Sequence, residues 1–274
     1  MTKWKPWLLQ LRRDLIVSPL QSDDRSTPGK LLGKSMDWIF NVAISGGQAN
    51  FDQHLDDLSP RDRAMLYAYA NQKTHIDELT HAFEKFLASP GHINNATVLD
   101  IGCGPFTAGL AFANIVETQF PYRYFGIDHA NSMLDFGNEL AQETIARGYV
   151  HEDSKISFCD DLNEVDFGSL RAAETTIVVL SYLLASESIQ ARQLVEQIVD
   201  ACNRISLGRV IVLYTNSARE SARKNFTPFK DEMLQNDFQL KIEEIEQFED
   251  ATKPRLIHYA VFVRNPVTLS ISEL

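Results

Sequence analysis

The sequence predicts an α/β protein with a seven-stranded doubly wound sheet whose last strand is antiparallel, plus an N-terminal helical region. Three observations lead to this fold class. From residue 97 onward, short apolar runs alternate with helical patterns, which is typical of a parallel sheet covered by helices. The runs IVVL and VIVL are continuously apolar, as in central strands buried on both faces. Only the short loop EDATKPR separates the final two strands, so these strands must pair antiparallel.

The chain has 274 residues and is expected to divide near residue 90. Residues 1–90 are predicted to form a helical arm or cap, and residues 91–274 the α/β core. Ser59 and Pro60 are typical of a helix start, and the Ser-Pro-Gly sequence at 89–91 is typical of a helix end. The apolar spacing between these points fits either one helix or two.

The core region is expected to contain seven strands in an α/β alternation. The strands are predicted at residues 97–101, 122–128, 155–161, 175–184, 209–216, 240–248 and 256–265. Helical spacing predicts intervening helices at residues 110–119, 132–148, 188–206 and 218–236. A loop and a short helix are expected after the third strand.

The composition is that of an ordinary soluble protein, with 44% hydrophobic residues. No apolar run approaches the roughly 20 residues of a membrane span, and the N-terminus does not resemble a signal peptide. Cys103, Cys159 and Cys202 are odd in number and lack metal-ligand spacing. We therefore expect reduced thiols, no metal site and a cytoplasmic location.

The net charge of −11 argues against a surface that coats nucleic acid. Residues 1–34 nevertheless carry more Lys and Arg than Asp and Glu, together with Trp4 and Trp7. This basic arm is expected to pack on its own protein or on a protein partner. Contact with RNA or another anionic surface is the alternative, and nucleic acid binding is possible only through this arm.

The stretch VLDIGCGPFTAG (98–109) runs from a predicted strand into two glycines separated by a cysteine. Gly102 and Gly104 lack a Cβ, so the backbone can turn sharply and approach a ligand closely. Ligands of open α/β sheets bind outside the carboxyl ends of the strands. A glycine pair alone is a weak signal, so a phosphate, another cofactor or a simple turn all remain open at this point.

In combination, the motifs of the core resemble those of class I S-adenosylmethionine (SAM)-dependent methyltransferases, which have a Rossmann-like fold. The resemblance covers about residues 90–265. It rests on an Asp-x-Gly-x-Gly motif, an acidic residue ending the second strand, an acidic pair after the third and the terminal strand pair. The residues concerned are Asp100, Gly102, Gly104, Asp128, Asp160 and Asp161. The resemblance implies SAM as the cofactor and methyl transfer as the activity.

Each acidic residue has an expected role. Asp128, at the end of a strand, can accept hydrogen bonds from both ribose hydroxyls; capping of a helix that begins at Asn131 is the alternative. The resemblance implies that Asp160 or Asp161 receives the adenine amino group, and we favour Asp160. Asp100 is expected either to contact the cofactor or only to fix the glycine loop by hydrogen bonds.

Two departures from the family pattern stand out. Phe106 occupies the position of a frequent third glycine, where its ring is expected to line the cofactor pocket or to restrict it. Pro105 before it is compatible with a helix start. The segment SYLLAS (181–186) lacks the Asn/Asp-Pro-Pro-aromatic sequence of enzymes that methylate amino groups of bases or glutamine. Methylation of those groups is therefore disfavoured.

The catalytic residues are not predicted, because methyl transfer is an in-line displacement that depends mainly on positioning. A general base is needed only when the acceptor loses a proton. Candidates for the acceptor pocket lie at the ends of the fourth and fifth strands and on one face of the helix before the core; packing roles are the alternative. These candidates are Ser181, Tyr182, Tyr214, Asn216, Tyr67 and His75.

The leading functional prediction is SAM-dependent methyl transfer to an unidentified small molecule, protein or RNA. The alternative is a methyltransferase-like subunit that binds cofactor or partner without turnover. A nicotinamide-dependent dehydrogenase is disfavoured by Asp100 before the glycines and by the antiparallel end of the sheet. Fold analogy indicates a cofactor class far better than it indicates a substrate.

Overall fold

The computed structural model describes residues 4–87, 95–172, 174–248 and 254–266. The predicted boundary at residue 90 and the helix-ending sequence at 89–91 lie outside the described residues.

The predicted seven-stranded sheet is confirmed. Its strands are β3 (Thr97–Ile101), β4 (Arg123–Ile127), β5 (Lys155–Cys159), β6 (Thr176–Ser181), β7 (Val210–Ser217), β8 (Gln239–Phe248) and β9 (Arg255–Arg264). The strand order is β5-β4-β3-β6-β7-β9-β8. The pairs from β5 through β7 are parallel, and β9 pairs antiparallel with both β7 and β8. A small additional sheet, which the sequence did not predict, pairs β1 (Lys30–Leu31) with β2 (Lys34–Ser35).

Helices precede the sheet and alternate with its strands. Before the sheet lie α1 (Pro6–Arg12), α2 (Ser18–Ser22), α3 (Met36–Trp38), α4 (Pro60–Tyr67) and α5 (Lys73–Leu87). Between the strands lie α6 (Thr107–Val116), α7 (Asn131–Ala146), α8 (Ala191–Ile205) and α9 (Phe226–Gln235). The π-helical turn η4 (Ala68–Gln72) joins α4 to α5. The predicted start of α4 is confirmed, since Ser59 forms a capping box with Asp62.

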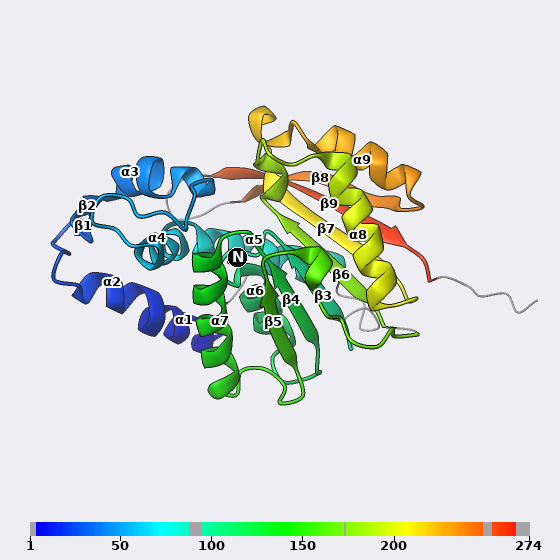
Figure 1. The fold of residues 1–274 in the computed structure, drawn as a ribbon, viewed down its shortest axis with the longest axis horizontal. Helices are drawn as coiled ribbons and strands as arrows, with labels where there is room; N and C mark the ends of the chain where they lie inside the picture. Colours follow the sequence, from blue (N-terminus) through cyan, green and yellow to red (C-terminus); the bar gives the residue numbers. More distant parts are fainter. Residues whose placement is uncertain (1–3, 88–94, 173, 249–253, 267–274) are drawn as a thin grey trace, which may run out of the picture.

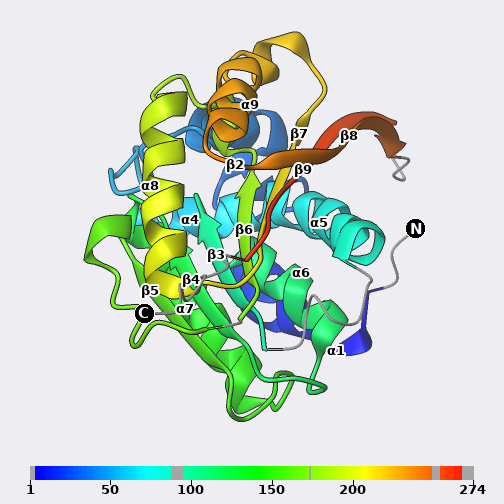
Figure 2. The same ribbon diagram turned by 90° about the vertical axis from the view of Figure 1, so that its right-hand side faces the viewer.

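Two helical layers cover the sheet, as Figure 1 and Figure 2 show. Because neighbouring strand residues point to opposite faces, Val98 and Leu99 of β3 belong to different cores. One core joins the face of Val98 to α1, α5, α6 and α7. The other joins the face of Leu99 to α8 and α9. The N-terminal helices therefore share a continuous apolar core with the sheet.

Two predicted helices begin at other residues than expected. The helix expected over 218–236 begins at Phe226, because Pro228 lies in its first turn and a proline further inside would clash with the preceding turn. The helix expected over 110–119 begins at Thr107, two residues after Pro105. Phe106 has a left-handed backbone with φ of 63°, so the regular helix can begin only after it.

The aromatic ring of Phe106 occupies the core between α6, α7 and the sheet. It is fully buried and packs edge-on against Tyr124 and Phe158, with ring centroids 4.9 and 5.8 Å away. A Cβ at Gly109 would come within 1.8 Å of this ring, and one at Gly137 within 3.2 Å of the Phe106 amide nitrogen. The two glycines therefore make the space that Phe106 fills.

This packing predicts that Gly109→Ala destabilises the protein by about 1–3 kcal/mol through overpacking. The sign of this stability change is informative, because Gly→Ala inside a helix ordinarily stabilises a protein by about 1 kcal/mol. Urea denaturation followed by circular dichroism measures the effect. Adding Phe106→Leu is expected to recover part of the loss. A Gly109→Ala variant at least as stable as the wild type would contradict the packing described.

Candidate functional site

The carboxyl ends of four parallel strands bring predicted cofactor residues and one predicted pocket residue to one edge of the sheet. The glycine loop follows β3, Asp128 follows β4, and Asp160 and Asp161 follow β5. Tyr182 follows β6, next to β3. Open α/β sheets bind their ligands at this edge.

The glycine loop is tied to the end of β4 by its backbone amides. Gly102 and Gly104 have φ of 75° and 51°, which is the region that glycine adopts without strain. The amides of Gly102 and Cys103 both donate to the Ile127 carbonyl, at 2.8 and 3.0 Å. The Gly104 amide donates to Asp128 Oδ2 at 2.9 Å. The conformation of the loop therefore depends directly on Asp128.

Asp128 does not cap α7, whose first amides have another partner. Its Oδ1 accepts from the Ala130 amide at 3.0 Å, a local turn rather than a helix cap. The amides of Asn131 and Ser132 donate to Asp52, at 2.9 and 2.8 Å. The N-terminal region thus supplies the carboxylate at the start of α7, where negative charge is favoured.

Asp100 is held inside the protein by a tyrosine. Its side chain is 2% exposed, and Oδ2 accepts from the Tyr124 hydroxyl at 2.6 Å. Burial raises the pKa of Asp100 to about 7, with the nearby Asp128 contributing and the Tyr124 hydrogen bond opposing. Cofactor contact by Asp100 stays a prediction.

The other predicted cofactor residues differ in their surroundings. The ring of Phe106 lies in the core described above, and its role as a wall of the pocket stays a prediction. Asp160 and Asp161 are exposed at the end of β5. Asp161 Oδ1 accepts from the Asn163 amide at 2.9 Å and caps a short 3-10 turn, whereas the Asp160 carboxylate lies beside the Cys159 thiol.

The cap helices lie directly on the glycine loop. A Cβ at Gly104 would come within 3.7 Å of Tyr67 Cε1 of the cap, whereas one at Gly102 would come within 2.9 Å of Leu183 Cδ1 in the turn after β6. Gln72 Nε2 donates to the Pro105 carbonyl at 2.8 Å. Within the described chain, the buried Gln72 Oε1 has no hydrogen-bond partner. The cap therefore places aromatic and amide groups over the predicted cofactor site.

A segment before α4, residues 45–52, crosses the same edge of the sheet; we call it the strap. At one end, Gln48 Nε2 donates to the Ala185 carbonyl beyond β6, at 3.2 Å. At the other end Asp52 caps α7, and between them Phe51 packs edge-on against Tyr67 at 5.6 Å. The strap thus spans the ends of β6, β3 and β4.

His75 and Tyr182, both predicted pocket residues, stack on each other. Their ring centroids are 4.1 Å apart and their planes differ by 20°. The ring of Tyr67 lies 6.4 Å from His75. Burial, with a smaller effect of Arg255, lowers the pKa of His75 to about 3, so the imidazole is uncharged at neutral pH. These three candidates are brought together beside the glycine loop.

Two residues that the sequence did not single out complete this cluster. Glu78 of α5 is fully buried, and its Oε2 accepts from the Tyr182 hydroxyl at 3.0 Å. Its other oxygen forms an ion pair with Arg255 of β9. Burial raises the pKa of Glu78 to about 7, against the lowering effects of Arg255 and Tyr182.

The remaining pocket candidates are not part of this cluster. Tyr214 is buried in the core on the α8 and α9 side, with its ring 4.7 Å from Phe226. Asn216 is buried as well, and its amide donates to the Ala222 carbonyl at 2.9 Å. Ser181 Oγ accepts from Thr215 at 3.1 Å. Acceptor contact by these residues stays a prediction.

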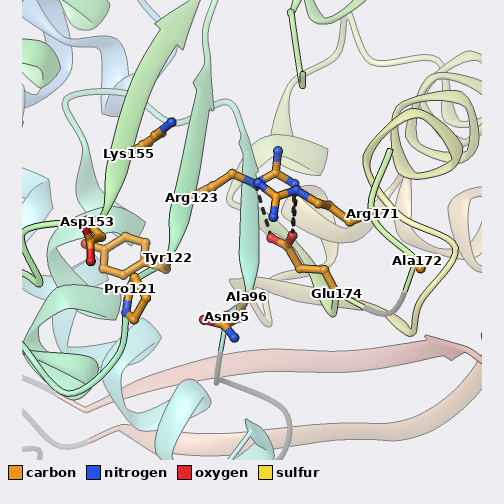
Figure 3. Close-up of a pocket in the computed structure, with 10 residues that line it drawn as sticks. All are labelled: Asn95, Ala96, Pro121, Tyr122, Arg123, Asp153, Lys155, Arg171, Ala172 and Glu174. Carbon is orange, nitrogen blue, oxygen red and sulfur yellow. Dashed lines mark hydrogen bonds and ion pairs between the residues drawn. The ribbon is translucent and has the colours of Figure 1, made fainter. Parts of the chain in front are cut away.

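A cavity of about 600 Å³ lies at the opposite edge, where β3, β4 and β5 begin. In Figure 3, Arg123 and Arg171 both point toward Glu174. Arg123 donates to both carboxylate oxygens at 3.3 Å, and Arg171 lies 3.7 Å away. Three of the charged residues that line this cavity, Arg123, Arg171 and Glu174, thus pair with one another. The cavity lies at the opposite ends of the strands from the glycine loop.

The N-terminal arm packs on the protein itself. Trp4 donates to Asp77 of α5, and Trp7 stacks on Tyr149 with ring centroids 4.8 Å apart. The buried Arg12 donates to the Ala68 carbonyl at 2.7 Å. Contact of this arm with RNA stays a prediction.

No described helix combines the length and apolar character that crossing a membrane requires. Among the described residues, no group of three or more His, Cys, Asp or Glu side chains is arranged to hold a metal ion.

No model of a known protein family matches the chain, and no curated protein matches it. Among solved structures, it is similar to magnesium protoporphyrin IX methyltransferase from Synechocystis with bound SAM, at 16% identity, 83% coverage of this chain, 90% of that chain and a TM-score of 0.44. It is also similar to a SAM-dependent methyltransferase from Leishmania major, at 15% identity, 86% and 94% coverage and a TM-score of 0.45. Likenesses at this level assign no activity, cofactor or acceptor to this chain.

The buried Asp100 predicts how stability depends on pH. Its pKa of about 7 in the folded state exceeds the ordinary value of 3.8, so the native state binds more protons between these values. The stability that the protonated carboxyl contributes is present below pH 4 and is lost as pH rises through 7. Asp100→Asn keeps an acceptor for Tyr124 and removes the ionisation.

At pH 8 we expect Asp100→Asn to be at least about 2 kcal/mol more stable than the wild type, and at pH 4 about equally stable. Urea denaturation at both pH values measures the difference. Asp160→Asn, which removes an exposed carboxylate at the same edge, serves as the control with a wild-type profile. An unchanged or lower stability of Asp100→Asn at pH 8 would show that Asp100 is not a destabilising buried charge.

Proposed function

We propose that this protein binds SAM at the carboxyl edge of the sheet and transfers its methyl group to an acceptor. The observation that carries the proposal is the hydrogen bond from the Gly104 amide to the Asp128 carboxylate. It joins a glycine loop after β3 to a carboxylate after β4, and a further acidic pair follows β5. The ends of three adjacent strands thereby lie side by side. They offer a glycine loop that a ligand can approach closely, and carboxylates at two positions that can accept its hydrogen bonds.

The residues present fit the polar groups of SAM. Each carboxylate oxygen of Asp128 accepts one backbone amide and retains a second lone pair for a ribose hydroxyl. Asp160, or Asp161, would receive the adenine amino group. Gln72 Oε1, which has no hydrogen-bond partner among the described residues, is suited to a donor such as the methionyl ammonium group. When bound, SAM supplies a methyl group that is already activated by its sulfonium.

The chain's own contribution would be positioning and exclusion of water. Tyr67 and Leu183 lie on the two glycines, and the strap crosses above them. In the conformation described, these side chains occupy the approach to the loop, so ligand entry requires them to move. Once closed over a ligand, the same side chains would keep water from the reacting groups and hold acceptor and methyl group in line.

The acceptor remains a small molecule, a protein or an RNA, and the location we propose is cytoplasmic. All three cysteines are free thiols, as is usual for proteins in reducing compartments. The second candidate function is a methyltransferase-like subunit without turnover. It is favoured by the loop itself, in which the amides of Gly102, Cys103 and Gly104 already donate within the protein.

Calorimetric titration with SAM and with S-adenosylhomocysteine tests the proposal. We expect both to bind and NAD not to bind. Asp128→Ala is expected to weaken binding at least about tenfold, or roughly 1.4 kcal/mol, because it removes the ribose acceptor and releases Gly104. Asp153→Asn, an exposed carboxylate at the opposite edge, is the matched control with unchanged affinity.

Circular dichroism and thermal unfolding establish that each variant is folded. No binding of either compound by the folded wild type would overturn the cofactor assignment and favour the non-catalytic subunit. An unchanged affinity of Asp128→Ala for both compounds would show that Asp128 is not part of the binding site.

A further inference from the structure

The buried carboxylate of Glu78 joins α5 to β9 through an ion pair, at a high cost in desolvation. It is fully inaccessible to solvent, and its partner Arg255 lies 177 residues away in the sequence. Burying such a carboxylate costs several kcal/mol in desolvation, and replacing a buried ion pair by apolar residues of similar size is often neutral or stabilising. Buried acids of this kind cluster at functional sites.

Tyr182, the hydrogen-bond partner of Glu78, has an unusual backbone. It has φ of 60° directly after the last residue of β6, a conformation that costs a non-glycine residue about 1–3 kcal/mol and is concentrated at functional sites. Its amide donates to the Thr215 carbonyl at 2.9 Å, and His75 stacks on its ring. The phenol is therefore fixed from two sides.

The pair lies next to the predicted cofactor loop. Leu183, the residue after Tyr182, is the side chain that a Cβ at Gly102 would meet. Tyr67 lies on Gly104 and packs against His75. A continuous layer of side chains thus leads from the glycine loop to the Tyr182 hydroxyl and on to Glu78.

We propose that Tyr182 and Glu78 form a proton relay for the acceptor, so that the methylated atom is an oxygen or nitrogen that bears a proton. This proposal rests on the proposed methyl transfer. The acceptor X–H forms a bond from X to the methyl carbon, and the methyl–sulfur bond breaks with its electron pair going to sulfur. The proton of X–H passes to Tyr182 Oη, while the Tyr182 proton passes to Glu78 Oε2.

The surroundings of Glu78 suit a proton acceptor at neutral pH. Arg255 of β9 and Tyr182 after β6 contact it, and Tyr259 of β9, Tyr67 of the cap and Asp77 of α5 interact with it electrostatically. Burial is the largest effect and raises its pKa to about 7, the range in which a general base works well. The relay requires the ionised carboxylate and therefore operates at and above neutral pH.

Tyr182 is a catalytic residue in this scheme, because its hydroxyl touches the acceptor, and Glu78 acts through it. An acceptor that carries no proton, such as a thioether or a tertiary amine, gains nothing from the pair. The relay therefore favours acceptor atoms that carry a proton over those that do not. This preference does not depend on the size of the molecule that carries the acceptor atom.

Infrared titration of the Glu78 carboxyl tests the relay without knowledge of the acceptor. The band is identified by its loss in Glu78→Gln and its retention in Glu84→Gln, an exposed carboxylate of the same helix. We expect a midpoint near pH 7 in the wild type. Tyr182→Phe is expected to raise that midpoint by about one unit, because it removes a hydrogen bond to the ionised form.

The titration is then repeated with SAM and with S-adenosylhomocysteine, which differ by the methyl group and the positive charge on sulfur. If the methyl group lies beside the relay, SAM lowers the Glu78 midpoint by at least about half a unit more than S-adenosylhomocysteine does. An equal effect of both compounds, or a midpoint insensitive to Tyr182→Phe, overturns the relay. Failure of the folded wild type to bind either compound overturns instead the proposed function on which it rests.

Discussion

The hydrogen bond between the Gly104 amide and the Asp128 carboxylate is the contact on which the candidate site depends. It fixes the loop after β3 against the end of β4 and, with the two amides donated to Ile127, sets the position from which α6 begins. A ligand that donates to Asp128 at this edge must do so beside the backbone amides that already donate to this carboxylate. The carboxylate is therefore oriented before any ligand arrives, which lowers the entropic cost of ordering this side chain on binding.

The cap is held on the sheet by polar groups that reach far across the chain. The buried Arg12 donates to two carbonyls of the π-helical turn η4, those of Ala68 and Tyr69. Arg63 likewise donates to the carbonyls of Ala43, Asn50 and Gln53 and so fixes the ends of the strap. Guanidinium groups suit this task because they offer five donors in a fixed plane.

The sequence was sufficient to predict what depends on local pattern. Alternating apolar runs predicted all seven strands, the short final loop predicted the antiparallel end, and the glycine loop and Asp128 were placed correctly at the sheet edge. The direction of the Phe106 ring was not predictable, because it depends on the space left by Gly109 one turn along α6. Glu78 and Arg255 were missed for a related reason. Each looks like an ordinary surface charge in its own element, and only the tertiary fold pairs them across 177 residues.

The continuous core between the N-terminal helices and the sheet has a consequence for how the chain is made. Leu8, Leu11 and Ile16 are fully buried in the same cluster as residues of α6 and α7, yet they leave the ribosome well before those helices. At about 5–20 residues per second, the roughly 130 residues from Ile16 to the end of α7 take about seven to twenty-six seconds to synthesise. During that interval the apolar side chains of α1 lack the helices that cover them in the folded protein and can contact solvent or other chains.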